Sequence, residues 1–545
     1  MKKIIALLLA LTMVLGLCAC GGDTAEAAPA QSGATEASAE AAAPAQDAAP
    51  AVEGEAEAEA EPVPAEDSPE PETLTVGTMD TTDTFDPCAA SSCRIGMMMV
   101  YDTILQLNYD NQEILPCIAS EWEWVDDTTL KLTIREDAVF SNGEPVTPED
   151  VLYSLSRFVF ENNTFDPGFD NIDFDASTIE GNILTLKLLE IDADFLFNLT
   201  NDQWASVVCK SYVEANPEAW WDAPVGSGPY ICLENQEGSH SSYELRDSYW
   251  GEMPDAEKVV IRHYSEATTM IADFENGALD VALNVDELDY LAALDGAYGE
   301  DVQSKLYPAY DVLSIQFPEY NPLFDDVRVR QAIAMSIDYA AFTNAVYGSL
   351  GTVADSFLIP NMQYYTSVGT PEYNPEKAKE LLKEAGVENL EMKLVIPSMP
   401  SNDKAAVILQ SFLADVGITL NVESYDFATA IPILMANGTD ISIGGTGGGT
   451  YLASLLLDTI SQYTTNGAAR ITDEEFNSHL DAALVTLDPE VRAQEYAAAQ
   501  QWLRENYRSI PVASSNAANL YHGRVSNLTG LVARTPNLSD VIITD

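Results

Sequence analysis

The chain has 545 residues and a formal net charge of −62 at pH 7, because 87 acidic residues outnumber 25 lysines and arginines. Such an excess of negative charge argues against binding to nucleic acid and against adsorption to anionic lipid. The length exceeds what one hydrophobic core usually supports, so we expect two or more lobes.

The N-terminus has the layout of a secretory signal peptide. Lys2 and Lys3 precede an apolar stretch, Ile4 to Leu17, which is shorter than the roughly 18 residues of a membrane-spanning helix. Small residues then surround Cys20, and this resembles the bacterial lipoprotein signal. We expect residues 1–19 to be the signal and Cys20 to be lipidated. An ordinary secreted protein is the alternative, and Cys18 is a poorer acceptor because Leu17 is too large for the preceding position.

A low-complexity acidic segment follows Cys20. Residues 23–72 consist mostly of Ala, Glu, Pro, Ser and Asp, without a basic or aromatic residue. Such a composition cannot bury enough apolar surface to offset the entropy of ordering. The segment therefore predicts a disordered tether over residues 20–72.

The first part of the body mixes strands and helices. The pattern predicts a strand at 74–76, a helix over 95–105 and an alternating strand over 130–134. Thr147 fits an N-cap, followed by Pro148 at the first helical position and Asp150 near the free N–H groups.

Cysteine and histidine usage indicates no metal site. Beyond the signal region the cysteines are Cys88, Cys93, Cys117, Cys209 and Cys232, an odd number, and the four histidines are scattered. Cys88 and Cys93 are close enough to close a small disulfide loop outside the cell. We expect no cofactor.

The second part of the body alternates strands and helices. This alternation predicts right-handed βαβ units on a mostly parallel sheet. The predicted strands are 311–317, 390–396, 418–422, 440–443 and 510–512, and the predicted helices are 327–347, 375–385, 405–416, 428–436 and 489–506.

Several motifs in fixed order resemble the dipeptide/oligopeptide class of extracellular solute-binding proteins of ABC importers, which includes nickel-binding relatives. The resemblance covers nearly all of residues 74–545. The motifs lie at residues 101–105, 116–122, 132–154, 224–230, 246–262, 274–282 and 325–338.

The resemblance implies an α/β, two-lobed fold of the periplasmic-binding-protein (Venus-flytrap) type, of the larger class with an extra subdomain in the first lobe. Paired crossings between the lobes are expected near 309–313 and 508–514. The implied boundaries are lobe I at 73–110, 223–310 and 508–545, its extra subdomain at 111–222, and lobe II at 311–507.

A glycine-rich segment is the strongest candidate for ligand contact. A predicted strand runs from Asp440 into five glycines, whose backbone can approach a ligand without side-chain obstruction. No lysine follows, so the segment is not a nucleotide loop. The candidates are Asp440, Gly444, Gly445, Thr446, Gly447, Gly448, Thr450 and Tyr451.

The resemblance adds further candidates and one departure. It implies a cleft edge at Asp86, Cys88, Ala89 and Ser91, an aromatic wall at Phe165 and Phe169, and a cleft floor at Ser514, Ser515 and Asn516. Peptide-binding members usually place a Trp and then an amine-holding acid after the glycine-rich strand. This chain has no carboxylate there until Asp458, so peptide, oligosaccharide and metal chelate all stay open as ligands.

These features predict a lipid-anchored solute receptor on the outer face of the cell membrane, extracellular or periplasmic. A monomer would capture a small solute between its lobes and deliver it to ABC permease subunits. The sequence has no Gly-x-Ser-x-Gly or HExxH motif, so we expect no catalytic residues and no enzyme. A sensor or adhesin with the same fold, and a hydrolase, are the alternatives.

Overall fold

The computed structural model describes residues 73–89, 94–108, 111–161, 168–360, 362–446, 452–462, 464, 467, 469–528, 531–532 and 535–544. All of them belong to one compact unit, Ala65–Asp545. The predicted signal peptide, Cys20, the predicted tether and Cys93 lie outside the described residues, so the lipidation and the disulfide stay predictions.

A ten-stranded sheet connects distant parts of the chain. Its strands are β1 (Thr73–Thr78), β8 (Tyr230–Gln236), β9 (His240–Leu245), β10 (Lys258–His263), β11 (Val281–Val285), β12 (Gln303–Pro308), β13 (Val312–Gln316), β14 (Gly351–Val353), β17 (Ser442–Thr446) and β18 (Ser509–Tyr521). The main path has the order β17-β13-β18-β11-β1-β10-β9-β8, and β12 and β14 also pair with β18. The helices α6 (Ala267–Glu275) and α7 (Glu287–Leu294) lie in the connections after β10 and β11.

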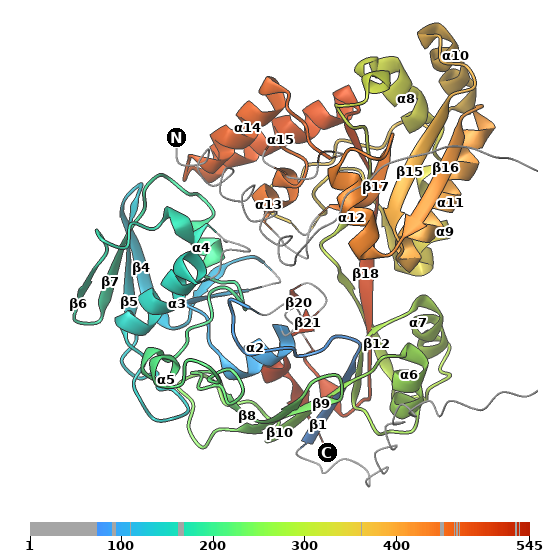
Figure 1. Ribbon diagram of the computed structural model, residues 1–545. Helices are drawn as coiled ribbons and strands as arrows, with labels where there is room; N and C mark the ends of the chain where they lie inside the picture. The colour runs from blue at the N-terminus through green and yellow to red at the C-terminus, as the bar shows by residue number, and fades with distance from the viewer. Residues whose placement is uncertain are drawn as a thin grey trace, which may run out of the picture. The chain divides into compact units, whose positions relative to one another are not determined.

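The two segments predicted to cross between lobes pair with one another. The last half of β18 is antiparallel to β12, from Pro308↔Asn516 to Gln303↔Tyr521, and its first half is antiparallel to β13. The Ala309 N–H donates to Ser515 O at 3.1 Å, which continues the pairing of β12 with β18 by one residue. In Figure 1, β18 runs between the β15–β16 side and the β8–β10 side of the molecule.

A smaller antiparallel sheet forms a separate layer in the first part of the body. Its order is β4-β5-β7-β6, and α3 packs near it. The elements here are α2 (Arg94–Val100), β2 (Leu105–Leu107), β3 (Ile114–Pro116), β4 (Ala119–Asp126), β5 (Thr129–Ile134), α3 (Pro148–Phe160), η1 (Phe169–Asn171), β6 (Thr178–Glu180), β7 (Ile183–Lys187), α4 (Phe195–Asn198) and α5 (Lys210–Ala215).

Local sequence signals predict the start of α3 correctly and the end of α2 incorrectly. The Thr147 hydroxyl accepts from the Asp150 N–H, and the Asp150 carboxylate accepts from the Thr147 N–H, which is a complete capping box. The helix predicted to reach Leu105 ends at Val100. Beyond it the backbone pairs with another segment, since the Ile104 N–H donates to Ala205 O and the Leu105 N–H to Leu199 O.

In the last part of the body, helices form in every segment predicted to be helical, with residues 327–347 divided into two helices, while the predicted sheet is wrong in part. Among the described residues there, β15 and β16 form a parallel strand pair joined through α11, and Leu394 and Ile441 form a single parallel bridge, whereas β13 is antiparallel to both β17 and β18. The reason is that β13 and β18 are opposite crossings of one connection and so run in opposite directions. The elements are η2 (Pro322–Asp325), α8 (Val327–Met335), α9 (Tyr339–Tyr347), η3 (Gly348–Leu350), α10 (Pro375–Ala385), β15 (Glu391–Pro397), α11 (Pro400–Asp415), β16 (Thr419–Tyr425), α12 (Phe427–Met435), α13 (Ala453–Asp458), α14 (Glu474–Leu484) and α15 (Pro489–Asn506).

A short C-terminal segment returns to the first part of the body. Val525, Leu528 and Leu538 are buried in the same hydrophobic cluster as Leu74 and Tyr230. Its elements are β19 (Val525–Ser526), β20 (Leu531–Val532), β21 (Thr535–Pro536), η4 (Leu538–Asp540) and β22 (Ile542–Ile543).

The buried hydrophobic side chains separate into two groups. One group of clusters draws on residues 74–293 and 518–541, and the other on residues 310–512 with the addition of Leu107. This division, with β18 passing from one group to the other, is the two-lobed architecture that the sequence predicts.

Two glycines beside Ser227 bring separate segments into close contact. A Cβ on Gly226 would lie 2.0 Å from Val100 O, and a Cβ on Gly228 would lie 2.7 Å from the Val100 carbonyl carbon. These approaches leave no space for any side chain. They fix the end of α2 against the turn that precedes β8.

Candidate functional site

The predicted cleft floor on β18 and the glycine-rich strand β17 lie on the two sides of β13. Leu313 of β13 is paired with Gly445 of β17 on one side and with Ala513 of β18 on the other. Among the described residues, no atom lies within 4 Å of a Cβ built on Gly444 or Gly445. The structure thus brings two of the predicted groups together. Gly447, Gly448, Thr450 and Tyr451 lie outside the described residues.

The polar side chains of the predicted floor make internal contacts. The Ser515 hydroxyl donates to Asp311 Oδ1 at 3.0 Å, and Asn516 Nδ2 donates to Leu350 O at 2.9 Å. Ser514 is 6% exposed and lies opposite Thr352 of β14. These bonds hold β18 against its neighbours.

Asp440 supports the backbone at the entrance to β17. Its Oδ2 accepts from the Lys393 N–H at 2.8 Å, and its carbonyl accepts from Asn321 Nδ2 at 3.1 Å. Thr446 continues β17 opposite Val312.

Asp86 forms a buried ion pair with Arg157 of α3. Two nearly parallel hydrogen bonds join Arg157 Nη1 to Asp86 Oδ1 at 3.0 Å and Arg157 Nη2 to Asp86 Oδ2 at 2.9 Å. Asp86 Oδ1 also accepts from the Cys88 N–H at 2.9 Å. Burial raises the pKa of the Cys88 thiol to about 12, so it stays protonated at neutral pH. Ala89 is exposed, and Ser91 lies outside the described residues.

Phe169 is a core residue and does not form the predicted aromatic wall. It is 0% exposed, and its ring centroid lies 5.7 Å from that of Phe158 and 6.4 Å from that of Phe195. A completely enclosed ring has no face for a ligand. Phe165, the other predicted wall residue, lies outside the described residues.

A buried ion pair that the sequence did not reveal joins the two groups of core clusters. Arg492 of α15 is hydrogen-bonded to Asp194 beside α4, and the Ser454 hydroxyl donates to the same carboxylate. Arg492 Nη1 also donates to Ala193 O, and the Ala193 N–H to Leu484 O. Burial, reinforced by the Asp194 charge, raises the pKa of neighbouring Asp192 to about 6.

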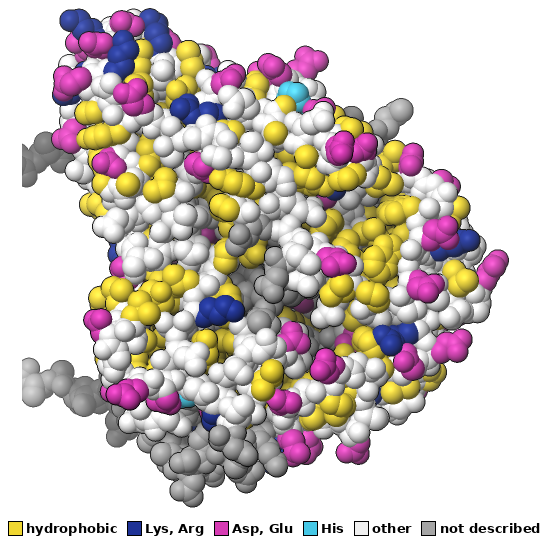
Figure 2. Space-filling view, turned by 180° about the vertical axis from the view of Figure 1, so that it is seen from behind, with side chains coloured by type: hydrophobic (Ala, Val, Ile, Leu, Met, Phe, Trp, Pro, Cys, Tyr) yellow, Lys and Arg dark blue, Asp and Glu magenta, His cyan; other side chains and the backbone are white. Residues whose placement is uncertain are grey.

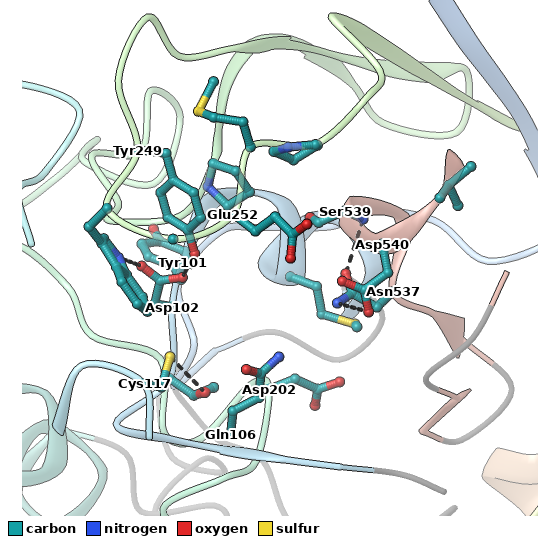
Figure 3. Close-up of a pocket in the computed structure, with 18 of the residues that line it drawn as sticks. Tyr101, Asp102, Gln106, Cys117, Asp202, Tyr249, Glu252, Asn537, Ser539 and Asp540 are labelled. Atoms are coloured by element: carbon teal, nitrogen blue, oxygen red, sulfur yellow. Dashed lines mark hydrogen bonds between the residues drawn. The ribbon is translucent and has the colours of Figure 1, made fainter. Parts of the chain in front are cut away.

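A pocket of about 420 Å³ lies apart from these contacts, between α2, the segment after β9 and the C-terminal segment. Figure 3 shows Tyr249 directed at Asp102, with Asp202 and Gln106 on the side of the drawing opposite to Glu252 and Asp540. The Tyr249 hydroxyl and Trp250 Nε1 each donate to Asp102 at 2.7 Å. Tyr101, Asp102, Tyr249 and Trp250 all belong to the motifs quoted above, but nothing in the sequence indicated that they share a pocket.

The described residues show neither a metal-binding cluster nor a membrane-spanning helix. There, no three His, Cys, Asp or Glu side chains gather in a way that would hold a metal ion. None of the helices in these ranges combines the length and apolar character needed to cross a membrane. Figure 2 shows acidic side chains scattered over one face, with far fewer basic ones among them.

Comparison with known proteins gives a consistent result. The probable ABC transporter periplasmic-binding protein SapA of Escherichia coli K12 is 26% identical over 486 residues, which cover 82% of this chain and 88% of that protein. Heme-binding protein A of Haemophilus influenzae is 26% identical over 463 residues, which cover 78% and 83%.

The solved dipeptide-binding protein of Pseudoalteromonas sp. SM9913, in complex with Met-Leu, has a TM-score of 0.71 and 23% identity and covers 87% of this chain and 100% of that one. This likeness confirms the predicted periplasmic-binding-protein fold. The family model of bacterial extracellular solute-binding proteins, family 5 (middle), matches residues 113–468. Because this match spans more than half of the 545 residues, the chain belongs to the bacterial extracellular solute-binding proteins of family 5.

Proposed function

We propose that this protein is the membrane-tethered receptor of an ABC import system, which captures a peptide or similar small solute between its lobes and delivers it to the permease. The family membership supports this proposal, together with a relative named as part of an ABC transporter and a dipeptide complex with the same fold. In this proposal the protein performs no catalysis and works as a monomer.

The observation that carries the proposal is the β12–β13/β18 connection. Two antiparallel crossings join the two groups of core clusters. We assign one group to lobe I with its subdomain 111–222 and the other to lobe II, residues 311–507. A pair of strands can bend as a hinge while each lobe keeps its packing. A solute that binds the closed form more tightly than the open form will close the lobes without any chemical step.

The open backbone beside β17 is the part of the cleft that we assign to the solute. Gly444 and Gly445 adopt no positive φ, and a Cβ built at either position has no atom of the described residues within 4 Å. A valine there is therefore compatible with the strand, but it would fill space that the solute needs.

We expect a dipeptide panel to contain a ligand that stabilises the protein by about 2.7 kcal/mol at 100 times its Kd. Thermal denaturation measures the stabilisation, and small-angle scattering measures the accompanying compaction. Gly445→Val should abolish both effects, because its side chain occupies the solute space. Thr419→Val, at an exposed position of β16, is the matched control and should respond like the wild type. A panel of dipeptides, oligosaccharides, heme and metal chelates that produced neither effect would contradict the transport function.

We infer that lipid on Cys20 anchors the receptor and that residues 20–72 tether it to the outer face of the membrane. The signal layout and the acidic composition of that segment support this inference. Cys20→Ser should move the protein from the membrane fraction into the soluble extracellular or periplasmic fraction, as measured by fractionation and immunoblotting. Cys18→Ser is the control and should leave the protein in the membrane fraction. Membrane retention of the Cys20→Ser variant would rule out this anchor.

A further inference from the structure

Three strands of lobe II end at one edge, and this edge faces lobe I. β13 leaves the crossing at Val312, and β17 is antiparallel to it, so β17 runs back toward the crossing and ends at Thr446, opposite Val312. β15 has the same direction as β17, because Leu394 and Ile441 form a parallel bridge, and β16 is parallel to β15. Ligands of open α/β sheets bind outside the carboxyl ends of such strands. Solute contact on lobe II is therefore expected along this edge.

Exposed apolar side chains lie at the carboxyl ends of β15 and β16. Met399 follows β15 and is 49% exposed, Tyr425 ends β16 and is 36% exposed, and Phe427 begins α12 and is 66% exposed. The two strand ends are joined, because Pro397 is paired with Tyr425 and the Ser398 N–H donates to Tyr425 O at 2.7 Å. We call Met399, Tyr425 and Phe427 the apolar edge. Exposed apolar residues that are grouped, and not scattered singly, indicate contact with a ligand.

The segments around the apolar edge have no cation for a solute carboxylate. Residues 397–403 and 423–427 contain no Lys or Arg, and the first basic residue of α11, Lys404, lies a full turn after the start of that helix. The same segments contain three carboxylates: Asp403, Glu423 and Asp426. A free peptide carboxylate placed at this edge would meet negative charge and no ion-pair partner.

The helices that begin at this edge do not provide an anion site. α11 carries Asp403 in its first turn, and the Asp426 carboxylate accepts from the Thr429 N–H at 3.0 Å at the start of α12. Hydrogen bonds from the Thr429 hydroxyl and N–H lower the pKa of Asp426, so this carboxylate is charged at neutral pH. Each helix N-terminus already has a negative charge from its own chain, so the helix dipole has little left to offer a bound anion.

A small solute can contact β17 and the apolar edge at the same time. β15 lies between β17 and β16, and neighbouring strands are about 4.8 Å apart, so β17 and β16 are separated by about 10 Å. The backbone of an extended dipeptide covers about 7 Å, and a side chain covers the remaining distance. A solute of this size on the Gly444 and Gly445 backbone would thus place one end at the apolar edge.

We propose that the apolar edge holds one end of the solute, and that the receptor prefers solutes whose group at this end is aromatic or aliphatic and uncharged over solutes with a free carboxylate there. Burial of the three side chains against the solute supplies affinity. The nearby carboxylates repel a solute anion and so supply specificity. The inference rests on the proposed receptor function and adds a substrate class to it: small peptide-like molecules with an apolar, neutral end.

Isothermal titration calorimetry on the full-length protein tests this proposal with three probes: alanyl-phenylalanine amide, alanyl-alanine amide and the free acid alanyl-phenylalanine. We expect the aromatic amide to bind at least about tenfold more tightly than either of the others, because burial of a phenyl ring is favourable and an unpaired carboxylate is costly. Phe427→Ala should remove most of the preference for the aromatic amide over alanyl-alanine amide. Met399→Arg should make the free acid the tightest ligand, since a guanidinium pairs with a carboxylate.

Val407→Ala and Val407→Arg are the matched controls, because Val407 is 60% exposed and lies two turns into α11. Both should bind the three probes like the wild type. The proposal is overturned if the wild type binds none of the probes at millimolar concentration, if it binds the free acid as tightly as the amide, or if either Phe427→Ala or Met399→Arg keeps the wild-type preference. Tight binding of the free acid would overturn this proposal and leave the transport function intact, whereas the transport function fails only if the wider solute panel gives no response.

Discussion

Replacing Arg492 with methionine should lower the free energy of unfolding by about 3–5 kcal/mol, which is the usual cost of removing one partner of a buried ion pair. Arg492 is 4% exposed and Asp194 5% exposed, so water cannot replace the lost contact. The guanidinium also donates to Ala483 O and Ala193 O at 3.1 Å, and its Cζ lies 5.1 Å from the ring centroid of Tyr364. The measurement is chemical denaturation followed by circular dichroism.

A double variant distinguishes the loss of a partner from the loss of packing. In Arg492→Met/Asp194→Leu no charge is left unpaired, and paired apolar replacements of this kind are often neutral. The double variant should therefore recover most of the stability that the single variant loses. Equal stability losses in the single and double variants would show that packing around the Arg492 side chain, and not the ion pair, provides the stabilisation.

The same pair has a consequence for the proposed hinge. Asp194 belongs to the proposed extra subdomain of lobe I and Arg492 to proposed lobe II, and Ser454 adds a second contact between them. These contacts favour the arrangement in which the two lobes touch. A solute therefore has to contribute only the part of the free-energy difference between the closed and open forms that these contacts do not provide.

The sequence predicts the features of this fold that depend on neighbouring residues. Thr147 and Asp150 are three positions apart, and their capping box follows from their order alone. Gly386 ends α10 with a φ of +74°, as its place after a periodic apolar run predicts. The crossing segments were predicted from family resemblance, and their pairing is confirmed in β13 and β18.

Contacts between residues far apart in the chain could not be predicted in this way. Asp194 and Arg492 are 298 positions apart, and in a chain with 87 acidic residues no single carboxylate is conspicuous. The pocket acids have the same difficulty, since Asp102 and Asp202 are 7% and 6% exposed and nothing in the sequence distinguishes them from the exposed acids. For Phe169 the prediction placed a core residue at the cleft. An aromatic residue after a helix can equally line a cleft or fill a core, and the sequence does not distinguish the two.

Replacing Arg157 with methionine should also destabilise the protein by about 3–5 kcal/mol, because it leaves the Asp86 carboxylate buried and unpaired. Arg157 is 4% exposed, holds Asp86 through two hydrogen bonds and lies 4.8 Å from the Trp220 ring centroid. The two hydrogen bonds join α3 to the segment before α2. Without them, the predicted cleft edge at Cys88 and Ala89 should become more mobile. Denaturant midpoints measure the stability, and hydrogen exchange measures protection at the Cys88 and Ala89 amides.

Arg328→Met is the matched control, because Arg328 also contacts an aspartate through several hydrogen bonds but does so at the surface. The side chains of Arg328 and Asp326 are 44% and 33% exposed, against 5% and 12% for Arg157 and Asp86. An exposed pair contributes at most about 1 kcal/mol, because water solvates both charges when the pair is broken. The buried and exposed pairs have similar bonding, so a difference of several kcal/mol between the two variants measures the effect of burial. Equal losses in the two variants would contradict the view that the Asp86–Arg157 pair organises the edge of the cleft.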